Sequence, residues 1–207
     1  LVSRELIADT QTPVSAYLRL ASGSRNTFLL ESVEGGEIRG RFSVIGLSPD
    51  LIWRCRGNVA EINRDPANSG EFSADSRAPI DSLRALMAES AMADTGDLPP
   101  MSAGLFGYFG YDMIRHIEAI PDANPAVIDT PDSMLVRPSL IAIFDRLKDS
   151  ITFVVQVRPA EWDEPQAAWS HAQDRIAAAL DALDAPMPPT EAGESTAPLP
   201  DPRSNME

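Results

Sequence analysis

The sequence predicts a mixed α+β domain, on two observations. Short apolar segments are joined by turn residues in the manner of antiparallel hairpins, at Arg56-Gly57 and again at 147–149. Other segments repeat apolar residues every three or four positions, which is the period of a helix with one buried face. The clearest of these is 165–183, where Trp169, Ala172, Ile176, Leu180 and Leu183 share a face.

The first half of the chain is expected to hold two helices and four strands. Pro13 and Pro79 stand at the starts of the two helices, where proline suits the first turn. The apolar run at 28–30 does not alternate with polar residues, which predicts a strand covered on both faces. Turns are expected at 34–37 and 48–50. The elements are a helix at 13–21, strands at 27–32, 41–47, 51–55 and 58–63, and a helix at 79–92.

The second half begins with a glycine-rich apolar segment, 102–108, which we expect to be a buried strand. Its glycines lack the spacing of a dinucleotide-binding or phosphate-binding loop, so close backbone packing is the favoured interpretation. Asp112 is expected to cap a short helix. The elements are strands at 102–108, 133–136, 140–145 and 150–157, and helices at 112–118 and 165–183.

A proline-rich segment follows the last helix. Six prolines and several acidic residues occur between Asp184 and Arg203. Such a composition buries too little surface to offset the entropy of ordering it. We therefore divide the chain into a domain at 1–184 and an acidic linker at 185–207, which we expect to lead into a further domain.

Composition limits the classes of function. A net charge of −14 over 207 residues argues against binding to nucleic acids or to anionic membranes. Cys55 is the only cysteine, so an intrachain disulfide and a cysteine-based zinc site are excluded. No apolar run has the length of a membrane span, and the first ten residues do not resemble a signal peptide. These features are typical of a cytoplasmic protein.

One polar pair at a strand end has two interpretations. Glu31 and Ser32 follow the apolar run 28–30, and a carboxylate beside a hydroxyl can hold the ammonium and carboxylate of an amino acid. The simpler interpretation is a strand that ends at the solvent. Arg41 is then an exposed strand residue or a partner of Glu31. His116 is most simply a helix-surface residue, and Asp145-Arg146 a turn, so the pattern alone shows no catalytic machinery.

Five motifs occur together in one order and change this assessment. They are Leu29-Leu30-Glu31-Ser32, Gly40-Arg41-Phe42-Ser43-Val44-Ile45-Gly46, Gly104-Leu105-Phe106-Gly107-Tyr108-Phe109-Gly110-Tyr111-Asp112, Pro131-Asp132-Ser133-Met134 and Ser204-Asn205-Met206. Each is weak alone. In this order and spacing, from about Leu6 to the end of the chain, the sequence resembles the N-terminal region of anthranilate synthase component I.

The resemblance implies a fold and an activity. The family has stacked antiparallel β-sheets flanked by helices. It is a lyase of tryptophan biosynthesis that converts chorismate and glutamine or ammonia to anthranilate and pyruvate, with a glutamine amidotransferase subunit (component II) as partner. Its catalytic residues and its Mg²⁺-binding glutamates lie in a C-terminal part. The resemblance therefore implies no catalytic and no metal-binding residue in this chain, and no activity of the chain alone.

The resemblance also implies an allosteric site for L-tryptophan, the feedback inhibitor. The family binds it at the motif that is here Leu30, Glu31 and Ser32, with Glu31 pairing with the ammonium. Arg39 and Arg41 are the candidates for assisting the carboxylate. Two alternatives remain open at this point: component I of aminodeoxychorismate (para-aminobenzoate) synthase, and a stand-alone amino-acid-binding module.

Overall fold

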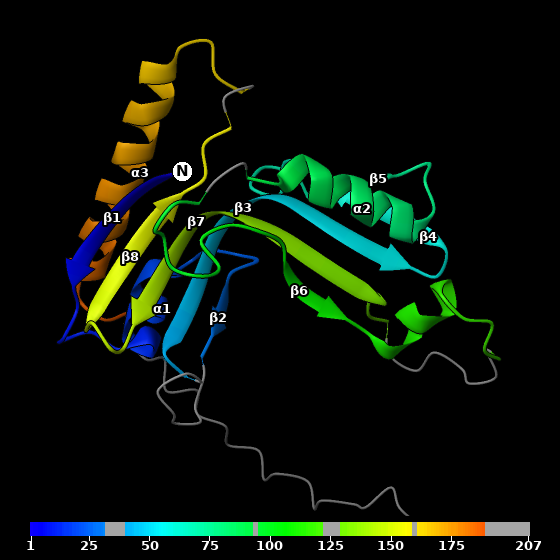
Figure 1. Ribbon diagram of the computed structural model, residues 1–207, viewed down its shortest axis with the longest axis horizontal. Helices are drawn as coiled ribbons and strands as arrows, with labels where there is room; N and C mark the ends of the chain where they lie inside the picture. Colours follow the sequence, from blue (N-terminus) through cyan, green and yellow to red (C-terminus); the bar gives the residue numbers. More distant parts are fainter. Residues whose placement is uncertain (32–39, 93–94, 122–128, 159–160, 189–207) are drawn as a thin grey trace, which may run out of the picture.

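A single antiparallel sheet with helices against it forms the fold (Figure 1). The structure, a computed structural model, describes residues 1–31, 40–92, 95–121, 129–158 and 161–188. The elements are β1 (Val2–Ile7), α1 (Pro13–Leu20), β2 (Phe28–Leu30), β3 (Phe42–Arg56), β4 (Val59–Asn63), β5 (Ser73–Ala74), α2 (Pro79–Ser90), β6 (Phe106–Phe109), the 3₁₀ helix η1 (Tyr111–His116), β7 (Ser133–Asp145), β8 (Ser150–Val155) and α3 (Pro165–Asp184).

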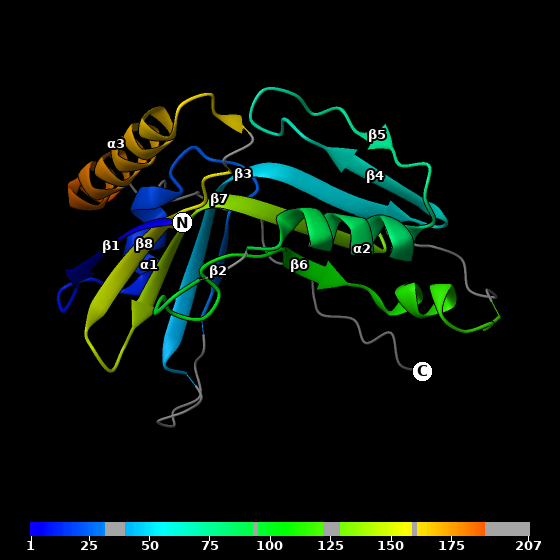
Figure 2. The same ribbon diagram turned by 45° about the horizontal axis from the view of Figure 1, so that its top comes forward.

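The sheet has the strand order β1-β8-β7-β3-β4-β5, while β2 pairs with β3 and β6 pairs with β7. This confirms the predicted α+β class, with antiparallel pairing in all seven strand pairs of the described residues. The sheet is continuous and curls, so that its two halves take the place of separate stacked sheets (Figure 2).

The bend between the halves has a local cause in β3 and β7. The two strands pair from Phe42↔Asp145 to Cys55↔Ser133, and the register shifts between Pro49 and Leu51. Pro49 stands opposite Pro138, and neither proline has an N–H to donate to the ladder. The extra residue on β3 forms a bulge, which bends the strand and increases its twist.

The first half of the sheet is covered on one face by α1 and α3. Thr12 and Ser15 form a capping box at the start of α1, with Pro13 in its first turn. The cluster beneath the two helices includes Ile45, Phe153 and Ile176, each with at most 1% of its surface exposed. Burial of these side chains fixes the helices on the sheet.

The second half carries α2. Trp53 of β3 is fully buried there, packed with Leu51 and Leu86. Its indole Nε1 donates to Ser82 Oγ at 3.0 Å, and Ser82 donates to Asp75 at 2.8 Å. A buried indole N–H needs such a partner, so this chain of bonds fixes the position of α2.

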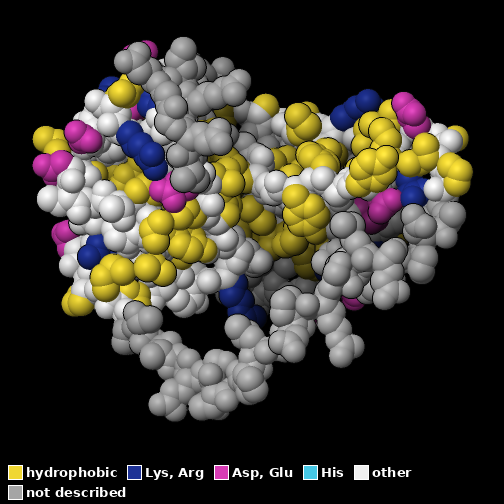
Figure 3. Space-filling model, turned by 90° about the horizontal axis from the view of Figure 1, so that it is seen from below, with side chains coloured by type: hydrophobic (Ala, Val, Ile, Leu, Met, Phe, Trp, Pro, Cys, Tyr) yellow, Lys and Arg dark blue, Asp and Glu magenta, His cyan; other side chains and the backbone are white. Residues whose placement is uncertain are grey.

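The opposite face of the first half, which we call the inner face, is made by Val44, Ile141, Ile143 and Val154. Aromatic and aliphatic side chains that are partly buried pack on it, among them Phe28, Phe42 and Phe106. Seen from below, hydrophobic side chains extend across both halves of the molecule (Figure 3).

Several elements differ from the prediction. The strands expected at 41–47 and 51–55 are one strand, β3, and those expected at 133–136 and 140–145 are one strand, β7. Ser48-Pro49-Asp50, predicted as a turn, is the bulged part of β3. A strand, β1, occupies the N-terminus, where none was expected. The segment 102–108 is not a buried strand: β6 begins at Phe106 and is largely exposed.

The short helix after β6 also differs from the prediction. The helix near 112 is a 3₁₀ helix capped by Gly110, whereas Asp112 lies in its first turn and accepts from Arg115 Nε at 2.8 Å. The expectation that Asp112 is the cap was therefore wrong.

Most of the predicted linker at 185–207 lies outside the described residues, so the division at 184 stays a prediction. Across the described ranges, no helix has the length and apolar character needed to cross a membrane.

A buried arginine connects the bend to α2. Arg137 of β7 has 5% of its side chain exposed. Its Nε donates to Asp50 Oδ1 at 2.7 Å, and its Nη1 donates to Glu89 at 3.0 Å and to Ser90 Oγ at 3.1 Å. The guanidinium thus joins β7, the bulge of β3 and the end of α2 through charge-assisted bonds.

These ion pairs predict a loss of stability in acid. Hydrogen bonds from Arg64 and Arg137 lower the pKa of Glu89 to about 2, and a hydrogen bond from Arg41 lowers the pKa of Asp145. The unfolded chain therefore binds protons at a higher pH than the folded chain does. We expect the free energy of unfolding to fall as the pH drops from about 4.5 toward 2, measured by urea denaturation at several pH values. The variant Glu89→Gln should show a shallower fall, and a slope equal to that of the unaltered chain would contradict this explanation.

Candidate functional site

Leu30 stands at the end of β2 on the same face as Phe28. It pairs with Val44 of β3, which belongs to the inner face. Side chains two residues apart on a strand point to the same side, so Leu30 extends this face toward the solvent, with 47% of its surface exposed. The Leu30 side chain is therefore an apolar surface beside a cluster of charged residues that includes Glu31.

Phe28 has a fixed place because the residue opposite it has no side chain. A Cβ at Gly46 would lie 2.1 Å from the Phe28 ring. The ring also stacks on Phe106 of β6, with centroids 4.9 Å apart. This contact brings β2 and β6 together, although 78 positions separate the two aromatic residues, and it forms one wall of the inner face.

Glu31 and Arg41 lie at one end of the sheet but bind different partners. Glu31 accepts from Arg146 Nη2 at 3.2 Å, in an exposed pair. Arg41 donates through Nε and Nη2 to both oxygens of Asp145, at 2.8 and 2.5 Å. The backbone N–H of Arg146 donates to the Arg41 carbonyl at 3.0 Å, which joins the two pairs. The result is a cluster of alternating charges beside Leu30.

Ser32 and Arg39, the remaining candidate site residues, lie outside the described residues. Arg41 lines a hollow of about 320 Å³ together with Phe42, Asp97 and Thr152, and neither Leu30 nor Glu31 is among the residues of its wall.

Sequence reasoning missed Asp145 and Arg146, which were interpreted as turn residues. Both take part in the cluster through partners that are 104 and 115 positions away in the chain. Because the sheet register creates these contacts, no local pattern identifies them. Arg41, for which Glu31 was considered as a partner, pairs with Asp145 instead.

Two of the three glycines of 104–112, Gly107 and Gly110, serve packing, as predicted. A Cβ at Gly107 would lie 1.9 Å from the Met134 carbonyl oxygen, and one at Gly110 would lie 2.6 Å from that of Asp132. Both glycines allow the backbone to approach β7 and the residue before it. This observation supports packing over ligand binding for the motif.

His116 lies beside Cys55, a contact that the sequence did not suggest. Cys55 Sγ is 3.6 Å from His116 Nε2 and donates to the Gly57 carbonyl at 3.3 Å. Burial, together with the negative charge of Asp132, raises the pKa of the Cys55 thiol to about 11. The thiolate that nucleophilic catalysis requires is therefore disfavoured at neutral pH, and the Cys55 side chain is fully buried, so the geometry does not favour a nucleophilic role.

The described residues show no arrangement for holding a metal ion. No group of three or more histidine, cysteine, aspartate or glutamate side chains gathers among them in a suitable way.

Comparison with known proteins identifies relatives over most of the chain. No protein-family model matches it. The chain is 46% identical over 185 residues to "Anthranilate synthase component 1" of Cereibacter sphaeroides. The matched segment covers 89% of this chain and 37% of the relative. The proteins of that name from Pseudomonas putida and Thermus thermophilus are 35% and 34% identical and cover 89% and 81% of this chain.

A solved structure agrees in fold. The crystal structure of anthranilate synthase component I from Streptococcus pneumoniae superposes with a TM-score of 0.59 at 24% identity, over 91% of this chain and 38% of that one. This likeness shows the fold alone. The chain spans a little over a third of the length of the curated relatives in Cereibacter sphaeroides and Pseudomonas putida. Within that segment, the chain belongs to the anthranilate synthase component I family.

Proposed function

We propose that this chain is the N-terminal, tryptophan-sensing portion of an anthranilate synthase component I. In this proposal the whole protein converts chorismate and glutamine-derived ammonia to anthranilate and pyruvate in the cytoplasm. The identity of 46% over 89% of the chain carries the proposal. Chorismate, Mg²⁺ and the glutamine amidotransferase subunit are assigned to the whole protein, and the 207 residues alone are proposed to be inactive.

The end of β2 is the proposed tryptophan site. Leu30 supplies apolar surface next to the inner face, where Phe28 and Phe106 stack, and an indole ring needs such a surface. Glu31 supplies a carboxylate for the ligand's ammonium. Its bond to Arg146 is long and exposed, and such a surface pair contributes little free energy, so a ligand ammonium can replace it at small cost.

Arg41 has a more limited role in this proposal. Its Nε and Nη2 already hold Asp145, so a ligand carboxylate would be met by Nη1 or by the Ser32 hydroxyl. Inhibition further requires that tryptophan bind one arrangement of the whole protein better than another.

The comparisons favour this function over the aminodeoxychorismate synthase alternative, because the relatives at 46% to 34% identity are named anthranilate synthase component 1. An assay of the product formed from chorismate by the whole protein distinguishes the two.

Substitution of the site tests the proposal. In the whole protein we expect Glu31→Ala and Ser32→Ala each to raise the tryptophan inhibition constant about tenfold or more, with uninhibited turnover unchanged, because the bond lost is charge-assisted. Glu71→Ala, at an exposed glutamate elsewhere, is the matched control. Inhibition constants equal to that of the unaltered protein in both site variants would refute the assignment.

A further inference from the structure

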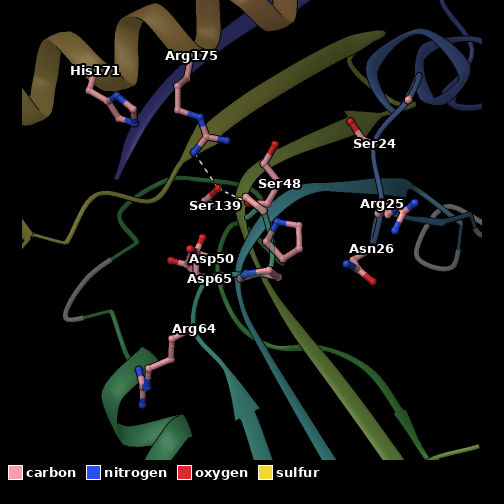
Figure 4. A pocket seen from close by; sticks show the side chains of 14 residues that line it. Ser24, Arg25, Asn26, Ser48, Asp50, Arg64, Asp65, Ser139, His171 and Arg175 are labelled. Carbon is pink, nitrogen blue, oxygen red and sulfur yellow. Dashed lines mark hydrogen bonds between the residues drawn. The ribbon is translucent and has the colours of Figure 1, made fainter. Parts of the chain in front are cut away.

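A second cavity, of about 680 Å³, opens at the bend of the sheet on the side of α3 (Figure 4). One wall is the loop 23–26 between α1 and β2, and the opposite wall is α3 at His171 and Arg175. The bulge of β3 at 48–50 and Ser139 of β7 lie between them. A volume of this size suits a small metabolite.

Arg175 is the central group of this cavity. Its guanidinium is half-buried on α3 and donates through Nη1 to Ser139 Oγ at 2.8 Å. Burial lowers its pKa, the direction expected when a cation loses water. Within the part of the chain that the structure describes, Arg175 forms no ion pair with a carboxylate, and the same is true of Arg25 on the opposite wall. A half-buried cation without a counterion is costly and favours an anion beside it.

The carboxylates near the cavity form no ion pair with Arg175, although the nearby charge of Asp50 partly offsets the effect of burial on its pKa. Asp50 uses Oδ1 to accept from Arg137 and Oδ2 to accept from Arg158. Asp65, at the rim, accepts from Asn68 at 2.8 Å. Arg64 forms a fork with Glu89 at 2.8 Å for both bonds, and Figure 4 shows it directed away from Arg175. Asn68 is neutral, so Asp65 keeps its negative charge. Three arginines in the lining (Arg25, Arg64 and Arg175) outnumber its two aspartates, Asp50 and Asp65, so the lining carries a net positive charge in a protein whose net charge is −14.

The remaining lining combines polar groups with the apolar residues Pro49, Pro66 and Ala67. Hydroxyl groups of Ser24, Ser48 and Ser139 and the amide of Asn26 face this space (Figure 4). Asn26 and Ser48 have φ values of 56° and 47°, in the left-handed region that residues other than glycine seldom adopt. Such conformations persist where the surrounding structure imposes them, and they cluster at binding sites. The Ser48 carbonyl accepts from Ser139 Oγ, which connects the bulge to Arg175.

We propose that this cavity binds a small metabolite bearing a phosphate or carboxylate group. The guanidinium fork of Arg175 holds the anionic group, Arg25 adds a second positive charge, and the serine hydroxyls and Asn26 bind the polar remainder of the ligand. The site is separate from the tryptophan site proposed at the end of β2, and it does not depend on that proposal.

Titration of the 207-residue chain by heteronuclear NMR tests this site. Inorganic phosphate and citrate, added separately in a low-salt buffer, represent the two anion chemistries. We expect saturable shifts of the backbone signals of 23–26, 48–50 and 171–175 with at least one of them. Arg175→Gln and Arg25→Gln should each weaken that binding about tenfold or more, because each removes a charge-assisted bond.

The controls separate a site from general charge effects. Arg84→Gln, which removes an exposed arginine of α2, should leave the affinity unchanged. Arg25 is exposed, so Arg25→Gln tests the site even if Arg175→Gln does not fold. The proposal is overturned if neither anion gives saturable shifts, if the folded site variants bind as tightly as the unaltered chain, or if Arg84→Gln weakens binding to the same extent.

Discussion

Replacement of Arg137 by alanine is expected to lower the free energy of unfolding by about 3 kcal/mol, because the charge-assisted hydrogen bonds and the packing of a buried side chain are lost, although Asp50 and Glu89 keep Arg158 and Arg64 as partners. Arg137 bonds to Asp50, Glu89 and Ser90 from a side chain that is 5% exposed. Its loss leaves Ser90 Oγ without this donor and weakens the connection between α2 and the bend. For a chain of 207 residues the melting temperature should fall by roughly 6–12 °C.

Urea denaturation of the 207-residue chain measures this effect. Arg84→Ala is the matched control, since Arg84 pairs with Asp81 on the surface of α2 and should contribute at most about 0.5 kcal/mol. Arg137→Lys should recover only part of the loss, because an ammonium group cannot reproduce the planar fork. Equal unfolding free energies for Arg137→Ala and Arg84→Ala would show that the buried cluster does not stabilise the bend.

Gly107→Ala is expected to destabilise the chain by about 3 kcal/mol, at the upper end of the range for overpacked sites. The new methyl group would lie 1.9 Å from the Met134 carbonyl oxygen and 2.9 Å from the Leu135 Cα, both of them backbone atoms of β7. The backbone of β6 therefore has to move away from β7. Since Phe106 of β6 stacks on Phe28, this movement should also open the inner face beside the proposed tryptophan site.

A second glycine provides the control for this prediction. Gly70 has no atom within 4 Å of an added Cβ, and its φ does not require glycine, so Gly70→Ala should leave stability unchanged or raise it slightly. Thermal unfolding followed by circular dichroism compares the two variants. The packing interpretation of the glycine motif fails if Gly107→Ala melts at the same temperature as Gly70→Ala.

Local patterns predicted most elements of this fold but not the connection between its halves. The helices at Pro13, Pro79 and Pro165 begin where the sequence signals placed them, and the hairpin at Arg56-Gly57 is present. The bend was misinterpreted as two separate strands because proline usually ends a strand. Here Pro49 and Pro138 face each other, so the ladder continues on both sides of them.

Side-chain burial was harder to predict than helix position. Trp169 was placed on the buried face of the last helix, yet 51% of it is exposed, and Ala168 and Ala179 are buried instead. The helical period predicts which residues share a face of the helix, but it fixes only approximately which face turns toward the sheet. Several rotations of the helix would bury a similar number of apolar residues. Contacts with the sheet decide between them.

The sequence and the family resemblance singled out Leu30 and Glu31 as site residues, and their role in binding tryptophan stays a prediction. Arg146, Asp145 and the stack of Phe28 on Phe106 were not predicted, because they depend on the register of strands distant in sequence. The cavity at Arg175 depends on the same bend, which no sequence pattern indicated.

Calorimetric titration of L-tryptophan into the whole component I protein tests the central claim most directly. We expect saturable binding by the unaltered protein and by Glu71→Ala, and an affinity about tenfold or more weaker in Glu31→Ala, since the bond from the ligand's ammonium is lost. Failure of the unaltered protein to bind tryptophan, or one affinity shared by all three proteins, would contradict the assignment of this chain as the tryptophan sensor.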